Sequence, residues 1–257
     1  MGMNKRFRQA NVDTWRRDGC VLIPNFFNSE EVAAVNADFE LVFARKEGAN
    51  EAMNKKKEGE VGRFNRAQFA TLEAVPFDCS PALNLIGVHP ALIRFAKEAL
   101  AADRVHLYQC QAWAKFTGDA DYDQPFHCDY VNHTLTAPSE VSARNSITIL
   151  CYFSDVSEDH GPAHYVTRTD AARIAGPEAT LSFDQDVQLR LQDGLKRFAR
   201  SSAAPAGSIM PYSIDIFHRG TNMMAPSVAH TMRSACYALS DHRRRVYPGI
   251  FRPRSPP

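Results

Sequence analysis

Within residues 124–130, one residue separates His127 from Asp129, and this spacing would allow both side chains to bind one metal ion. If this segment is extended, both side chains point to the same side and their Cα atoms lie about 6.5–7 Å apart. An imidazole nitrogen and a carboxylate oxygen can then reach one metal ion at about 2.1 Å each, while Cys128 points to the opposite side. Because nine histidines and 29 acidic residues yield roughly one His-x-acid pair by chance, the pair alone carries little weight.

A second candidate ligand, His218, follows Asp129 by 89 residues, at the predicted end of a strand and before a glycine turn. Arg233 comes 15 residues later. Two histidines and one carboxylate form the facial triad of non-haem iron(II) oxygenases, which leaves positions open for a co-substrate and oxygen. A guanidinium one strand further on can pair with a dicarboxylate, and each charge-assisted hydrogen bond contributes about 1.5–3 kcal/mol. The order of these residues predicts an iron site that binds an oxoacid.

Other histidines compete with His218 for the third ligand position. His133 could serve only if the chain turned back, and His164 lies in a predicted strand. His230 precedes Arg233 by three residues and is the main alternative. We expect His218 to be the ligand.

The elements that must position these residues change character along the chain. The first hundred residues favour helices over 12–17, from Ser29 onward, from Pro81 and over 90–100, with a strand over 19–27. Strand-like patterns follow at 104–116, 145–153, 163–167, 208–217 and 232–240, with a helix within 181–199. We therefore expect one domain over 1–257, mainly β with flanking helices. Its helical part would span about 10–100, and a double-stranded β-helix (jelly-roll, cupin-like) barrel about 104–242.

The polar stretch 46–66 contains the run Lys55–Lys57 and three glycines. A solvated surface loop is the first interpretation, because charge runs usually lie in solvent. A mobile cover over the active site is the alternative, because long loops in compact domains often close over substrates.

Composition excludes several classes of protein. Formal net charge is +1, from 30 basic and 29 acidic side chains, which gives no general reason to expect nucleic acid or an anionic membrane as partner. The six cysteines form no C-x-x-C pair, so we expect reduced thiols and a cytoplasmic location. No stretch approaches transmembrane length, and no apolar run follows the basic N-terminal residues, which argues against a secretory signal.

The order of these motifs resembles the phytanoyl-CoA dioxygenase (PhyH-like) family of Fe(II)/2-oxoglutarate-dependent oxygenases. Segments 18–27, 113–129, 147–169 and 207–233 carry the resemblance, which extends over most of the chain. The resemblance implies a hydroxylase or related oxygenase that uses Fe(II), 2-oxoglutarate and O2 on a small-molecule substrate and releases succinate and CO2. Related halogenases replace the carboxylate ligand by a small residue, so Asp129 argues for hydroxylation, desaturation or ring closure.

The resemblance also implies a role for individual residues. His127, Asp129 and His218 match the iron ligands, and Arg233 matches the residue that binds the C5 carboxylate of 2-oxoglutarate. Further polar contacts to the co-substrate are expected from Lys115 and Gln111. The residues expected to border the substrate are Trp113, Phe126, Tyr130 and Asn132, with ordinary packing in the barrel core as the alternative.

The sequence departs from the family pattern after the strand that ends near Asp155. Where members often carry Gly-Cys and then a Pro-Gly-Ser-His turn, this chain has Gly161-Pro162 and then residues 167–170. This departure lies outside the iron ligands and concerns the local loop geometry and any substrate contact there. Two other functions are also kept open: a jelly-roll metalloenzyme that does not use 2-oxoglutarate, and a non-catalytic binding protein of the same fold.

Overall fold

The computed structural model describes residues 6–43, 73–74, 76–115, 123–129, 146–176, 191–224 and 229–238, with only the main chain described in 73–74, 229–238 and at positions 108, 113 and 175. Several expectations lie outside these residues: the polar stretch 46–66, Tyr130, Asn132 and His133.

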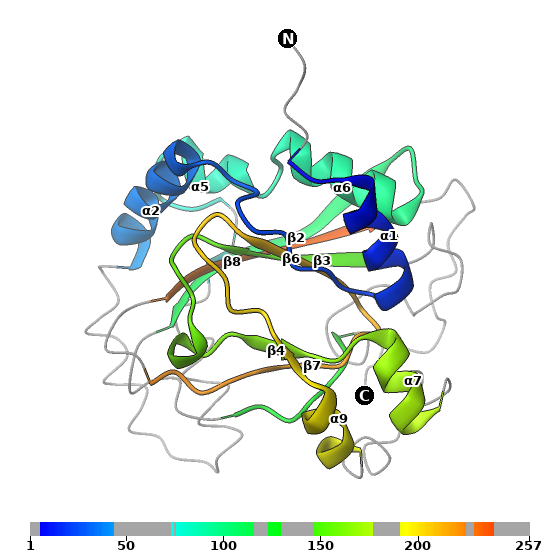
Figure 1. The fold of residues 1–257 in the computed structure, drawn as a ribbon. Helices are drawn as coiled ribbons and strands as arrows, with labels where there is room; N and C mark the ends of the chain where they lie inside the picture. Colours follow the sequence, from blue (N-terminus) through cyan, green and yellow to red (C-terminus); the bar gives the residue numbers. More distant parts are fainter. Residues whose placement is uncertain are drawn as a thin grey trace, which may run out of the picture.

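Helices from the N-terminal half cover one face of the larger sheet (Figure 1): α1 (Gln9–Asp18), α2 (Ser29–Phe43), α5 (Pro81–Ile86) and α6 (Pro90–Leu100). The starts predicted at Pro81 and Pro90 are confirmed, because proline fits the first turn, where its missing N–H would have no partner. The preceding side chains complete both caps. Ser80 accepts a hydrogen bond from Ala82 N, and the His89 ring accepts one from Ala91 N.

The described strands form two sheets. The larger, antiparallel sheet has the order β1-β2-β8-β3-β6, built from β1 (Glu73–Ala74), β2 (Val105–Lys115), β8 (Ala229–Ala238), β3 (Ser146–Tyr152) and β6 (Ile209–Ser213). The smaller sheet has the order β5-β4-β7, built from β5 (Arg200–Ser201), β4 (Ala163–Tyr165) and β7 (His218–Gly220). The short helices α7 (Arg168–Ala175) and α9 (Gln192–Phe198) lie beside the smaller sheet, and the 3-10 turn η3 (Glu158–His160) precedes β4.

The central strand β3 is buried on both faces. In β3, Ile147, Ile149 and Cys151 pack under the helices, whereas Leu150 belongs to a second apolar cluster with Tyr165 of the smaller sheet. Every residue of β3 is buried, including the polar Ser146 and Thr148. The second cluster joins the two sheets into one core.

One predicted strand, 208–217, is wrong as a single element. The strand β6 ends at Ser213, a turn closed by the bond from Ile216 N to Ser213 O follows, and β7 begins at His218. His218 therefore starts a strand of the other sheet instead of ending the first. The apolar run continues through the turn because Ile214 and Phe217 are buried between the sheets and the neighbouring helices.

The other element boundaries are close to expectation, with two corrections. The strand expected over 19–27 makes only isolated bridges, from Cys20 to Tyr212 and from Ile23 to Ile209. Val21 N donates to Pro211 O, but Pro211 has no N–H to return the bond, so the ladder is broken between the two bridges. The strand expected over 163–167 ends at Tyr165, since the Thr167 side chain accepts a bond from Asp170 N and starts α7.

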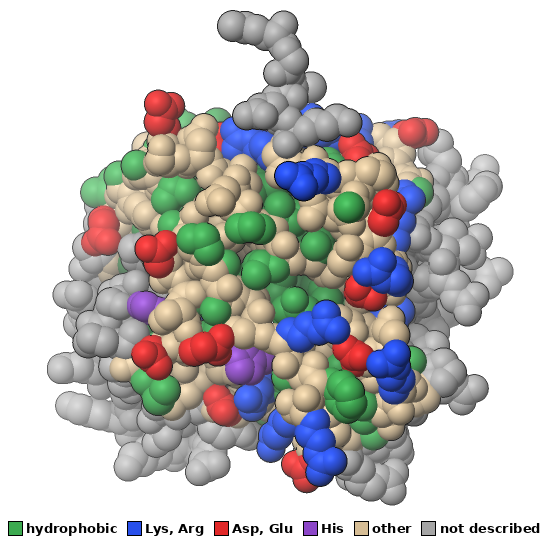
Figure 2. Space-filling model, viewed as in Figure 1, with side chains coloured by type: hydrophobic (Ala, Val, Ile, Leu, Met, Phe, Trp, Pro, Cys, Tyr) green, Lys and Arg blue, Asp and Glu red, His purple; other side chains and the backbone are tan. Residues whose placement is uncertain are grey.

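The visible surface in Figure 2 carries acidic and basic side chains interspersed, in agreement with the net charge of +1. None of the described helices is long and apolar enough to cross a membrane. The five cysteines whose side chains are described are free thiols.

Gly161, just after η3, generates a prediction about stability. Its φ is +65°, and a Cβ there would lie 2.5 Å from the Thr221 carbonyl oxygen, whereas Gly176, at φ +75°, has no atom within 4 Å of such a Cβ. Replacement by alanine should cost about 1–3 kcal/mol of unfolding free energy at either position, because Gly161 is left-handed and Gly176, at ψ 165°, lies in a backbone region almost confined to glycine. Gly161→Ala should cost about 1–3 kcal/mol more, from the clash. Urea unfolding of both variants compares them, and equal losses would contradict the expectation.

Candidate metal centre

The centre is built on a direct pairing between the segment 123–129 and β7. His127 N donates to His218 O at 3.0 Å, and His218 N donates to His127 O at 2.9 Å. Gln124 N extends the pairing by donating to Gly220 O at 3.0 Å. Residues directly opposite each other in an antiparallel pair present their side chains on the same face. The two imidazole rings therefore meet, with ring centroids 4.6 Å apart.

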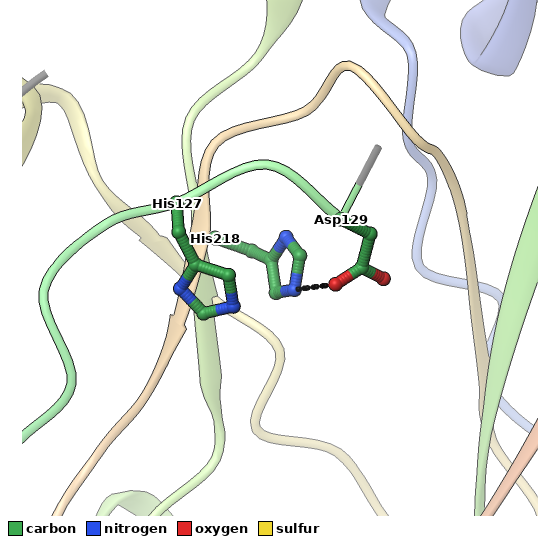
Figure 3. A group of neighbouring side chains, drawn as sticks. All are labelled: His127, Asp129 and His218. Carbon is green, nitrogen blue, oxygen red and sulfur yellow. Dashed lines mark ion pairs between the residues drawn. The ribbon is translucent and has the colours of Figure 1, made fainter. Parts of the chain in front are cut away.

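Asp129 completes the cluster from the same segment (Figure 3). One of its carboxylate oxygens, Oδ1, lies 3.4 Å from His218 Nε2, and its side chain is almost fully buried. One ligand atom from each of His127, Asp129 and His218 lies within 4.8 Å of the others, so all three can reach one ion. The predicted convergence of these residues is therefore present in the structure.

Both histidines are held in the tautomer that a metal requires. His127 Nδ1 lies 3.0 Å from Pro125 O, and His218 Nδ1 lies 3.0 Å from Ile216 O. A carbonyl oxygen can only accept, so each Nδ1 donates its hydrogen and Nε2 is the ring atom left to bind a metal. These bonds also fix the ring orientations, as backbone carbonyls do for metal-binding histidines generally.

The donor set fits iron(II). Two neutral imidazoles and one carboxylate are the ligands of the facial triad, which leaves positions for a co-substrate and oxygen. Cys128 points to the other side, as predicted, where its thiol contacts Asp215 O at 3.5 Å. Burial raises the pKa of this thiol, so Cys128 stays neutral and does not compete as a thiolate ligand.

Among the rival histidines, His164 points away from the cluster, with Nε2 3.1 Å from Glu158 Oε2. His230 lies in β8 opposite Ala114, where only the main chain is described.

Gln192, on α9, bonds the main chain of the segment 123–129, which carries His127. Its side-chain oxygen accepts from Phe126 N at 2.7 Å, and its side-chain nitrogen donates to Phe126 O at 2.9 Å. The Gln192 carboxamide thus makes the two main-chain hydrogen bonds that a neighbouring strand would make, at the residue next to the metal ligand His127. The sequence contains no signal for this contact, because 66 residues separate the partners.

Lys115, expected at the co-substrate, has partners in the loops. Its buried Nζ donates to Gly161 O and, at 3.0 Å, to Thr221 O. Burial lowers the pKa of Lys115 to about 8. The lysine therefore ties the end of β2 to the segments before β4 and after β7, and its contact with 2-oxoglutarate stays a prediction.

The remaining predicted residues are placed by register or packing. Arg233 of β8 lies opposite Gln111 of β2 on one side and opposite Leu150 of β3 on the other. Position 233 is thus on the sheet face that meets the smaller sheet, because Leu150 packs there. Phe126 is 2% exposed and packs against Phe217, under the Arg219 guanidinium. Trp113 is described only in its main chain, opposite Thr231. Substrate contacts of Phe126 and Trp113 stay predictions.

Comparison with known proteins identifies the family. The sequence profile of the phytanoyl-CoA dioxygenase family (PhyH) matches residues 15–223. The chain belongs to this family. It is a non-haem iron dioxygenase that depends on 2-oxoglutarate, with His127, Asp129 and His218 as the candidate iron triad. No curated protein matches the sequence significantly.

Several solved structures share the fold of this chain. The carbocyclase SnoK from nogalamycin biosynthesis, described as non-haem and α-ketoglutarate-dependent, is 17% identical, with a TM-score of 0.64 over 92% of this chain and 87% of its own. The apo form of EctD from S. alaskensis is 13% identical, with a TM-score of 0.66 over 98% and 84%. The epimerase SnoN, solved with Fe3+, α-ketoglutarate and nogalamycin RO, is 15% identical, with a TM-score of 0.59 over 89% and 82%.

The buried Lys115 predicts a pH dependence of stability. Its pKa is about 8 in the folded chain and 10.5 ordinarily, so the unfolded chain binds more protons between these values. The free energy of unfolding should therefore rise with pH from 8 to 10.5, by up to about 3 kcal/mol. Lys115→Met should lack this rise. Urea unfolding of both proteins at pH 7.5, 9 and 10.5 measures the difference, and parallel pH curves would refute the assignment.

The Gln192 contact predicts a coupled loss of stability and metal binding. Gln192→Ala leaves the Phe126 N–H and carbonyl without these bonds, which should cost about 1–3 kcal/mol of unfolding free energy. Because His127 is the next residue, Co(II) affinity should fall about 3- to 10-fold, which is less than the usual 10- to 100-fold loss for partners that bond a metal ligand directly. Gln9→Ala is the control, since Gln9 bonds Asp13 on an exposed helix face. Unchanged Co(II) affinity in Gln192→Ala would show that this clamp does not position the ligand.

Proposed function

We propose that this protein hydroxylates a small organic metabolite, or desaturates or cyclises it, and releases succinate and CO2 from 2-oxoglutarate. The observation that carries the proposal is the convergence of His127, Asp129 and His218 within 4.8 Å, with the Nδ1 atom of each histidine engaged by a main-chain carbonyl. Such a centre, once loaded with iron, 2-oxoglutarate and O2, supplies the oxidising power to break a C–H bond.

The protein's own residues orient the reactants in this proposal. His127, Asp129 and His218 would hold the iron through three ligand atoms, which would leave positions for the co-substrate and O2. Arg233 pairs with the C5 carboxylate of 2-oxoglutarate, assisted by Gln111, which shares its register in the sheet. Lys115 contributes by holding the loops around Gly161 and Thr221, with one remaining ammonium hydrogen for a polar contact.

We further propose that the two sheets close into a double-stranded β-helix barrel, in one domain that covers the chain. The crossing at 214–217 and the pairing of His127 with His218 support this closure. The apolar cluster of Leu150, Tyr165 and Met210 fills the space between the sheets. A jelly roll of this kind presents ligands on its inner face.

The proposed substrate is a small molecule rather than nucleic acid or a membrane lipid surface, because the chain has a nearly balanced charge. Proteins of related fold include a carbocyclase, an epimerase and EctD, which was solved with 5-hydroxyectoine. The same fold therefore accommodates several reaction types, and which of them occurs depends on the substrate that is bound. The free thiols of the described cysteines favour a reducing cytoplasm.

Anaerobic titration tests the proposed function. Apo-protein given Fe(II) and then 2-oxoglutarate should develop the weak visible charge-transfer band of an iron–oxoacid chelate, and on exposure to air it should release succinate slowly without substrate. Arg233→Gln should bind 2-oxoglutarate about 100-fold more weakly, because it loses about 3 kcal/mol of charge-assisted bonding. Arg94→Gln is the matched control, since Arg94 lies on the outer helix α6, over the Phe7 ring.

The outcomes separate the alternatives. A metallated protein with no charge-transfer band and no dependence on 2-oxoglutarate would instead be a jelly-roll metalloenzyme of another class. A protein that takes up no iron and releases no succinate would be a binding member of the fold.

A further inference from the structure

Tyr212, in β6, contacts the candidate iron ligand Asp129. Its hydroxyl donates to Asp129 Oδ2 at 2.9 Å, and both residues are almost fully buried. The phenol ring also packs against His218, with ring centroids 4.7 Å apart. Tyr212 therefore contacts two of the three ligands at once.

The two oxygens of Asp129 have different surroundings. Oδ1 faces His218 Nε2 at 3.4 Å, and Figure 3 shows the other oxygen turned away from both imidazoles. That second oxygen is the one bonded to the Tyr212 hydroxyl. A lone pair engaged by a buried phenol is less available to a metal, so Asp129 is prepared to offer Oδ1 alone.

Coordination by one oxygen matters because carboxylates bind metals through either one or two oxygens. A facial triad with a one-oxygen carboxylate uses three of the six positions of an octahedral ion, and a chelating oxoacid uses two more. The sixth position remains for O2. If Asp129 bound through both oxygens, the sixth position would be filled.

The main chain holds Tyr212 in this position. Its strand lies between β3, where Thr148 is its partner, and the segment at Cys20, which forms an isolated bridge to it. The ring belongs to the apolar cluster with Met210 and Ile216. Because strands flank the residue on both sides and its ring is packed, the hydroxyl cannot swing away from Asp129 without disturbing the core.

We propose that Tyr212 is a positioning residue that restricts Asp129 to one-oxygen coordination and so keeps a position open on the iron. This inference rests on the proposed function, since it assigns Asp129 to the metal. Tyr212 acts through Asp129 and need not touch the substrate.

Cobalt(II) binding to the apo-protein, without 2-oxoglutarate, tests the inference independently of turnover. Tyr212→Phe removes only the hydroxyl and should weaken Co(II) binding about 10- to 100-fold, as is usual when a metal ligand loses its outer partner. Its visible Co(II) bands should also change in position and intensity, because a second carboxylate oxygen alters the coordination. Tyr152→Phe is the matched control: it removes a buried phenol hydroxyl bonded to Ser202, and it should leave the affinity and the bands unchanged.

A second background separates positioning from packing. In Asp129→Ala, where Tyr212 has no carboxylate to hold, Tyr212→Phe should change the remaining Co(II) affinity less than 2-fold. Tyr212→Phe would overturn the role of Tyr212 in either of two cases. One is an equal loss of Co(II) affinity in the wild-type and Asp129→Ala proteins, and the other is wild-type Co(II) affinity and visible bands in the single variant. If the wild-type protein itself bound no Co(II), the proposed function would fail instead.

Discussion

The candidate site depends on one pair of reciprocal main-chain hydrogen bonds, between His127 and His218. These residues are 91 positions apart, and no side-chain chemistry would bring them together without that pairing. Because the two are directly opposite in an antiparallel pair, their imidazoles lie on one face, and Asp129 reaches the same point two residues later. The geometry of the ligands is therefore a property of the backbone.

Buried polar contacts from distant elements then hold this backbone. Gln192 bonds Phe126 from α9, Tyr212 bonds Asp129 from β6, and Lys115 bonds two loop carbonyls from β2. In a low-dielectric interior each such group would be costly without its partner, so the contacts favour one arrangement over nearby ones. Rigidity of this kind lets a metal bind without reorganising its ligands.

The family determines the class of chemistry, whereas the choice of substrate depends on residues outside the metal triad. Dependence on α-ketoglutarate is common to enzymes whose outcomes differ, as the carbocyclase and epimerase of related fold illustrate. Differences among them must come from the groups that hold the target carbon against the iron, and these groups belong to the pocket rather than to the triad.

The sequence by itself determined the helix starts at Pro81 and Pro90, the long strands β2 and β3, and the identity of the converging ligands, because local propensity and residue order carry this information. Only the tertiary structure decided that the run 208–217 breaks at Ser213 and that Tyr212 and Gln192 support the site. An apolar run looks the same whether its backbone continues or turns between two sheets. A hydrogen bond between residues far apart in sequence depends on how whole elements pack, and no local pattern records that.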